Sequence, residues 1–198
     1  MAKLFFYYSA MNAGKSTVLL QSHHNYIERG METLLYTAAL DNRCGYGMIS
    51  SRIGLKQEAL TYDEEFNFFE DVSKRKVQMK SLACILIDEA QFLSKKHVLE
   101  LCKIPDKLGI PVLAYGLRTD FRGELFEGSQ YLLGLAEELI EIKTICTCGR
   151  KATMNLRMDT NGQPMLEGDQ IEVGGNETYV ALCRRCFDQK RERAILGL

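Results

Sequence analysis

The chain has 198 residues, 46% of them hydrophobic, and a formal net charge of −1. This length and composition indicate one globular domain with its own core, or one domain with a small appendage. The balanced charge disfavours direct binding to nucleic acid, and the lack of a long apolar run disfavours a membrane span. Because seven cysteines occur without the pattern of a signal peptide, we expect a cytoplasmic protein whose thiols are reduced or metal-bound.

The first two thirds of the chain alternates between strand-like and helix-like segments. Strands are expected at residues 4–8, 33–37, 84–88, 111–116 and 139–145. Helices are expected at residues 15–29, 63–74, 95–108 and 128–138. Pro105 should break or kink the third helix, and the polar, glycine-containing segment 41–61 should be a loop. The alternation predicts an α/β fold in which helices flank a parallel sheet.

Residues 9–17 (SAMNAGKST) resemble the phosphate-binding pattern G-x-x-x-x-G-K-[ST], with Ser9 at the first glycine position. The loop lies between an expected strand and an expected helix, as the pattern requires. Backbone N–H groups and the helix N-terminus would hold phosphate oxygens. Lys15 would contact the β- and γ-phosphates, and the Ser16 hydroxyl would bind Mg²⁺. The alternative is a strand–turn–helix corner in which Gly14 only turns the chain.

Asp88 and Glu89 follow an apolar run and form a second candidate element of a phosphate site. In phosphate-loop enzymes an Asp at such a strand end holds Mg²⁺ or its waters. Glu89 would lie at the carboxyl end of the sheet, where it could act as a general base. Two structural alternatives compete, since both carboxylates could cap the next helix or be solvated charges at the strand end.

Four further side chains follow expected strands near the same edge of the sheet. Arg118 or Arg122 could neutralise charge on a transferred phosphoryl group, or both could be solvated surface residues. Phe92 and Phe121 could stack on a flat base, although core packing is the default interpretation of a phenylalanine.

The composition changes beyond residue 145, where two cysteine pairs occur. Cys146 and Cys148 are followed by Cys183 and Cys186, which predicts a structural zinc site with four cysteine ligands. The alternative is four reduced thiols without a metal. We therefore divide the chain into a nucleotide-binding domain (1–145), a zinc-binding module (146–190) and a tail (191–198). Cys84 and Cys102, on apolar faces, are expected in the core.

Together these motifs resemble the cellular-type, zinc-containing thymidine kinases, a group with bacterial members. The resemblance spans essentially the whole chain. It rests on the four cysteines and on segments 9–17 (SAMNAGKST), 88–92 (DEAQF), 115–121 (YGLRTDF) and 174–179 (GGNETY). It implies a RecA-like P-loop sheet with a zinc module whose loop covers the substrate. It also implies ATP-dependent phosphorylation of thymidine or deoxyuridine at the 5′-hydroxyl, which gives dTMP for DNA synthesis by salvage. The Cys-x-Cys spacing at 146–148 departs from the Cys-x-x-Cys of other members.

The resemblance also assigns site residues and partners. Glu89 corresponds to the base that activates the 5′-hydroxyl, and Phe121 to the residue that packs against the thymine. The residues implied to bind ATP and Mg²⁺ are Ser9, Ala10, Met11, Asn12, Ala13, Gly14, Lys15, Ser16, Asp41, Asn42, Arg43, Asp88, Glu89, Ala90 and Gln91. The residues implied to bind the nucleoside are Met11, Phe92, Leu117, Phe121, Phe126, Gln170, Ile171, Glu172, Val173, Gly174 and Tyr179. A homotetramer, structural Zn²⁺ and feedback inhibition by the end-product triphosphate are implied as well.

Two rival functions belong to other classes. Residues 88–91 (DEAQ) are similar to the acidic motif of motor ATPases and helicases, in which the Glu activates water. The chain is too short for two motor lobes, and its balanced charge disfavours tracking on nucleic acid. The second rival is a binding protein whose zinc ribbon docks a partner while ATP is only a structural ligand.

Overall fold

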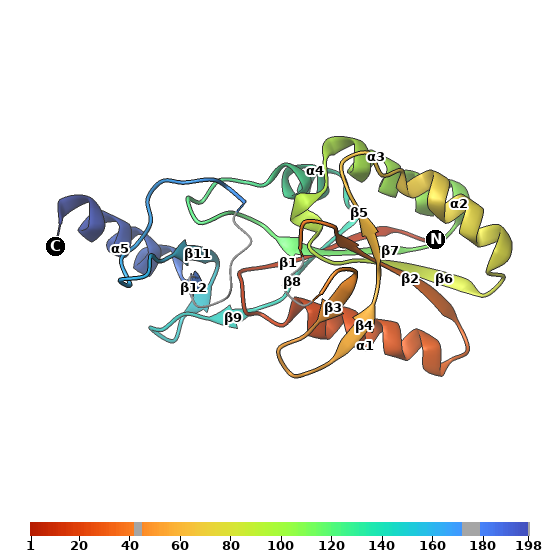
Figure 1. Ribbon diagram of the computed structural model, residues 1–198, viewed down its shortest axis with the longest axis horizontal. Coiled ribbons are helices and arrows are strands. Elements are labelled where there is room, and N and C mark those ends of the chain that lie inside the picture. The colour runs from red at the N-terminus through yellow and green to blue at the C-terminus, as the bar shows by residue number, and fades with distance from the viewer. Residues whose placement is uncertain (42–44, 172–178, 198) are drawn as a thin grey trace.

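The structure, a computed structural model, describes residues 1–41, 45–171 and 179–197. A six-stranded sheet with the order β5-β2-β6-β7-β1-β8 forms its centre, and every pair of neighbouring strands is parallel (Figure 1). The strands are β1 (Leu4–Ser9), β2 (Glu32–Ala38), β5 (Leu60–Tyr62), β6 (Leu82–Ile87), β7 (Val112–Leu117) and β8 (Glu138–Glu141). The prediction of a parallel sheet flanked by helices is confirmed.

Helices cover both faces of the sheet. Successive residues of a strand point to opposite faces, so the buried strands supply two separate cores. Leu86 packs with Leu19 of α1 (Lys15–Glu28) on one face. Ile87 packs on the other face, in the core shared with α2 (Phe68–Gln78), α3 (Lys95–Lys103) and α4 (Glu127–Leu135). Figure 1 shows α1 on one side of the sheet and the other three helices opposite it.

The expected helices differ from the observed ones mainly at their ends. The second helix begins at Phe68 and not at residue 63, because the Asn67 side chain accepts a hydrogen bond from the Glu70 N–H and caps it. The third expected helix is two elements, since α3 ends at Lys103 and a π-type turn, η2 (Ile104–Leu108), follows. Pro105 stands at the start of η2, so the predicted break is confirmed.

The prediction of a loop at 41–61 was wrong where short strands interrupt that segment. It contains β3 (Met48–Ser50) and β4 (Lys56–Glu58), which form an antiparallel pair, and it ends in the edge strand β5. Each of these strands has three residues, which are too few to show the alternation of apolar and polar residues that is typical of a strand. Ile49, at 1% exposure, attaches the pair to the core beside α1.

The C-terminal module lies at one end of the sheet (Figure 1). It contains β9 (Thr144–Ile145), β10 (Lys151–Ala152), β11 (Met154–Arg157), β12 (Tyr179–Leu182) and α5 (Arg184–Leu196). The expected strand at 139–145 is therefore split between β8 and β9, and α5 includes most of the segment interpreted as a tail. Among the residues of the module that the structure describes, the buried apolar ones are Cys146, Ala152, Leu156, Leu182, Cys183 and Phe187. None of the helices in the described ranges has the length and apolar character needed to cross a membrane.

Candidate functional site

The predicted phosphate loop joins β1 to α1 at the carboxyl end of the sheet. Gly14 precedes the first helical residue with φ 85°, a left-handed conformation that glycine adopts at low cost. Ser9 is not among the residues with positive φ, so its position does not require glycine. The Lys15 Nζ lies 3.4 Å from the Ser9 Oγ. The loop therefore places Lys15 and Ser16 in the first turn of α1, whose free N–H groups face the end of the sheet.

Asp88 directly follows β6 and lies beside this loop. Its Oδ2 accepts a hydrogen bond from the Ser16 hydroxyl at 3.2 Å. Its Oδ1 is buried and has no hydrogen-bond partner in the described part of the chain. Burial, reinforced by the charge of Glu89, raises the pKa of Asp88 to about 7. A buried carboxylate oxygen next to a serine hydroxyl fits the oxygen ligands that Mg²⁺ prefers.

Glu89 has an unusual backbone and a fixed carboxylate. Its φ of 51° lies in the left-handed region, which non-glycine residues seldom adopt and which concentrates at functional sites. Gln91 Nε2 donates to Glu89 Oε2 at 2.5 Å, and the Tyr62 hydroxyl donates to the Glu89 carbonyl at 3.1 Å. The Glu89 side chain makes no capping bond to the short helix η1 (Ala90–Phe92) that follows. The helix-cap alternative is therefore wrong for Glu89, and the burial of Asp88 excludes a solvated strand-end charge there.

These residues line a cleft of about 830 Å³. The predicted ATP-site residues on its wall are Met11, Asn12, Gly14, Lys15, Ser16, Asp41, Asp88, Glu89 and Gln91. The predicted nucleoside-site residues on its wall are Met11, Phe92, Leu117, Phe121, Phe126, Gln170, Ile171 and Tyr179. Ser9, Ala10, Ala13 and Ala90 are not on the wall. Asn42, Arg43, Glu172, Val173 and Gly174 lie outside the described residues.

Several residues on the cleft wall were not predicted. They are Thr17, Leu40, Met48, Ser50, Ser51, Arg52, Ile53, Thr119, Asp120 and Asn155. Arg52 is a cation on this wall, whereas neither Arg118 nor Arg122 lines the cleft. Arg118 donates to the Thr153 carbonyl at 3.5 Å, and Arg122 pairs with Asp120 at 3.3 Å. The hypothesis that Arg118 or Arg122 neutralises the phosphoryl group therefore finds no support in their placement.

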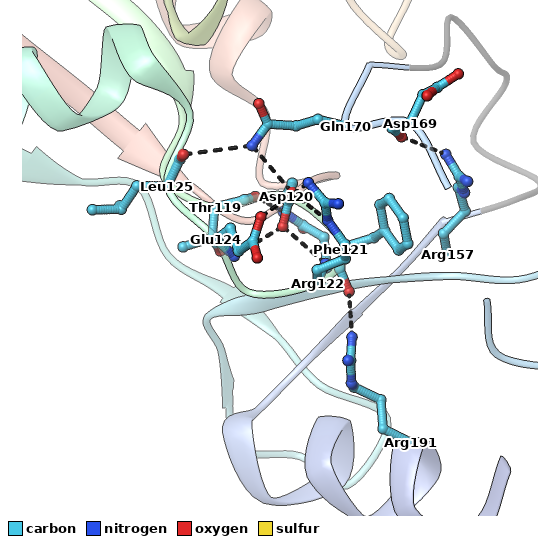
Figure 2. Close-up of polar contacts among 11 residues, drawn as sticks. Thr119, Asp120, Phe121, Arg122, Glu124, Leu125, Arg157, Asp169, Gln170 and Arg191 are labelled. Carbon is cyan, nitrogen blue, oxygen red and sulfur yellow. Dashed lines mark hydrogen bonds and ion pairs between the residues drawn. The ribbon is translucent and has the colours of Figure 1, made fainter. Parts of the chain in front are cut away.

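Phe121 is held by side chains from the C-terminal module (Figure 2). It is 1% exposed, and the guanidinium carbon of the buried Arg157 lies 4.0 Å from the centroid of its ring. Arg157 also donates to the Asp169 carbonyl at 3.2 Å, and Arg191 donates to the Phe121 carbonyl at 3.3 Å. These contacts join β11 and α5 to the loop that follows β7.

The same loop is tied to the segment predicted to cover the nucleoside. The Asp120 carboxylate accepts hydrogen bonds from the backbone N–H groups of Arg122 and Glu124, at 2.8 and 2.9 Å. Gln170 Nε2 donates to Asp120 at 3.1 Å, and Figure 2 shows the Gln170 side chain reaching across to this loop. Gln170 is thus hydrogen-bonded to the loop that carries Phe121.

The four predicted cysteines come together in the module. The sulfur atoms of Cys146, Cys148, Cys183 and Cys186 all lie within 4.8 Å of one another, and the Cys146–Cys148 and Cys148–Cys183 distances are 3.5 and 3.7 Å. A tetrahedral zinc ion with bonds of about 2.3 Å needs sulfurs about 3.8 Å apart. Burial opposes ionisation of Cys146, but the N–H groups of Cys148 and Cys183 outweigh it and lower the pKa of Cys146 to about 6. The donor set fits structural zinc, the Cys-x-Cys spacing included.

Comparisons with known proteins identify the family of this chain. The sequence model of the family described as thymidine kinase matches residues 2–187. A thymidine kinase of Legionella pneumophila (strain Lens) is 61% identical over 184 residues, which cover 93% of this chain and 88% of that protein. A thymidine kinase of Zymomonas mobilis is 58% identical over 190 residues, which cover 96% of this chain and 98% of that protein. A crystal structure of Pif1 helicase from Candida albicans aligns with a TM-score of 0.39 at 18% identity, over 73% of this chain and 36% of that one, which is too low to bear on function. The chain therefore belongs to the thymidine kinase family.

Proposed function

We propose that the protein transfers the γ-phosphoryl group of ATP to the 5′-hydroxyl of thymidine and releases ADP and dTMP. One observation supports this above all others. A single cleft is lined both by Lys15, Ser16 and Asp88 of the phosphate site and by the aromatic side chains of Phe92 and Phe121. Such a cleft can hold a nucleoside triphosphate and a flat nucleoside base at the same time.

The donor side of the cleft suits a triphosphate. The backbone N–H groups of the phosphate loop would bind phosphate oxygens, and Lys15 would neutralise the β- and γ-phosphates. Ser16 and Asp88 would hold Mg²⁺, which when bound offsets the charge of the phosphate oxygens. Arg52 adds a further cation on the wall of the same cleft.

The acceptor side supplies a base and a platform. As the 5′-oxygen of the nucleoside attacks the γ-phosphorus, its proton would pass to the Glu89 carboxylate, and ADP would leave. The hydrogen bond from Gln91 keeps that carboxylate in one orientation. Met11, Leu117, Phe121 and Phe126 would enclose the base. Deoxyuridine, which lacks only the methyl group of thymine, should also be a substrate.

Further parts of the proposal rest on the family resemblance. They are a homotetramer in the cytoplasm, salvage of thymidine for DNA synthesis and feedback inhibition by the end-product triphosphate. Structural zinc in the module is supported by the geometry of the four sulfurs. The roles of Asn42, Arg43 and residues 172–174 also rest on the resemblance alone.

A product assay across the deoxynucleosides tests this function. The protein is incubated with ATP, Mg²⁺ and each of thymidine, deoxyuridine, deoxyadenosine, deoxyguanosine and deoxycytidine, and nucleoside monophosphates are separated by chromatography. We expect dTMP and dUMP to form with one ADP for each monophosphate. ATP hydrolysis that DNA or RNA stimulates and thymidine does not would favour the motor ATPase instead. ATP binding with no phosphorylated product would favour the zinc-ribbon binding protein.

A further inference from the structure

β11 lies between the two parts of the molecule. Leu156 points into the small core of the module, together with residues of β12 and α5. The neighbouring side chains of β11, Asn155 and Arg157, are 2% exposed and contact loops of the nucleotide domain. Alternate residues of a strand point to opposite faces. One face of β11 therefore packs in the core of the module, and the other contacts the nucleotide domain.

Asn155 bridges the loops that follow two neighbouring strands. Its Oδ1 accepts a hydrogen bond from the Met11 N–H at 2.7 Å, and its Nδ2 donates to the Thr119 carbonyl at 3.0 Å. Ser9 at the end of β1 pairs in register with Leu117 at the end of β7. Met11 and Thr119 therefore occupy equivalent positions, two residues beyond the last paired residues of the two strands. The backbone pairing of β1 with β7 ends at Ser9 and Leu117, and the Asn155 amide links the two chain segments just beyond that point.

The two bridged loops belong to opposite sides of the proposed reaction. Met11 is in the loop that would hold the phosphates of ATP, and Thr119 is in the loop that carries Phe121, the proposed platform for the base. Met11, Thr119 and Asn155 all lie on the cleft wall. One buried amide thus links the donor loop to the acceptor loop from a third segment of the chain.

We propose that Asn155 is a positioning residue that sets the distance between the ATP phosphates and the nucleoside hydroxyl. The inference rests on the proposed function. With the bridge intact, the γ-phosphorus faces the 5′-oxygen and transfer to the nucleoside outruns transfer to water. Without it, the two loops move independently, and a displacement near 1 Å is enough to slow an in-line transfer about a hundredfold. Water can then take the phosphoryl group, which gives ADP and inorganic phosphate.

The test uses the full chain with its metal, and it measures two products at saturating ATP and thymidine. Asn155→Leu has a similar size and makes neither hydrogen bond. We expect kcat for dTMP formation to fall about tenfold to a hundredfold, and the ratio of ADP to dTMP to rise at least about twofold. A loss of folded protein would lower both products equally and leave their ratio unchanged, so the ratio separates positioning from stability.

Two further variants complete the test. Asn155→Asp keeps an acceptor for the Met11 N–H but places an oxygen against the Thr119 carbonyl, so its product ratio should lie between those of the wild type and Asn155→Leu. It also carries the test if Asn155→Leu does not fold. Asn161→Leu makes the same substitution at an exposed turn of the module and should leave the ratio unchanged. The inference is wrong if folded Asn155 variants keep the wild-type ratio. If the wild type itself forms no dTMP, the result contradicts the proposed function, and it does not contradict the link that Asn155 makes between the two loops.

Discussion

At the scale of single residues, Glu89 is the side chain whose geometry most clearly suits chemistry. Its backbone is left-handed, Gln91 holds its carboxylate, and it lies on the cleft wall. Glu89→Gln keeps the shape of the side chain and removes its capacity to accept a proton. Because a positioned general base contributes about 10²- to 10⁴-fold, we expect kcat for dTMP formation to fall by that factor. The KM values for ATP and thymidine should change far less.

Steady-state kinetics and a thermal unfolding curve check this expectation. Glu65→Gln, at an exposed position, is the matched control and should behave as the wild type. If Glu89→Gln, folded and able to bind both substrates, turned over near the wild-type rate, the base would have to be another group.

Residues in short motifs could be predicted, while residues that act over long sequence distances could not. Ser16 and Asp88 were identified because each stands at a fixed place in a local strand–loop pattern. Asn155 lies 144 residues from its partner Met11, and nothing in the residues around it indicates that contact. Arg52 lies in the segment that was expected to be a loop, and its place on the cleft wall depends on the packing of β3 beside α1.

At the scale of elements, α4 packs so closely on η1 that its second residue must be glycine. A Cβ on Gly128 would lie 2.6 Å from the Leu93 carbonyl oxygen and 2.7 Å from that of Ala90. Gly128→Ala should therefore lower the free energy of unfolding by about 1 to 3 kcal/mol, the usual cost of overpacking. Urea unfolding followed by circular dichroism measures this change.

Gly134 in the same helix is the matched control, because a Cβ there would meet nothing within 4 Å. Gly134→Ala should raise the free energy of unfolding by up to about 1 kcal/mol through helix propensity alone. Equal stability of the two variants would show that η1 moves away to accommodate the methyl group.

The accuracy of the element predictions follows from length and burial. The inner strands β1, β2, β6 and β7 are apolar runs bounded by turn residues, so the alternation with helices identified them. The three-residue strands β3, β4 and β5 show no period, and tertiary contacts such as that of Ile49 decide their conformation. The start of α2 depended on which of several polar residues acts as the cap, and only the structure shows that it is Asn67.

At the scale of the whole molecule, the nucleotide domain and the module differ in what stabilises them. The sheet has a buried core on each face, whereas the described part of the module has six buried apolar residues, two of them metal-ligand candidates. A core this small rarely supports an independent fold without a metal or a disulfide, and every cysteine in the described ranges is a free thiol. We therefore expect about one zinc ion per purified chain, as element analysis would measure.

Removal of the metal should then affect, through β11, both the loop that would hold the ATP phosphates and the loop that carries Phe121. Cys148→Ser replaces an exposed sulfur, so it removes a ligand with little loss of packing. We expect this variant to lose zinc and to be cleaved by protease within residues 142–171. It should also form dTMP at least about tenfold more slowly, because Asn155 and Arg157 would no longer contact the nucleotide domain. Cys102→Ser, outside the cluster, should keep zinc and activity. Since β11 pairs with β12, which ends at Leu182 directly before the ligand candidate Cys183, loss of the metal removes the anchor of the strand that bridges the two loops. A zinc-free Cys148→Ser protein with wild-type kcat would show that β11 is held by the nucleotide domain alone.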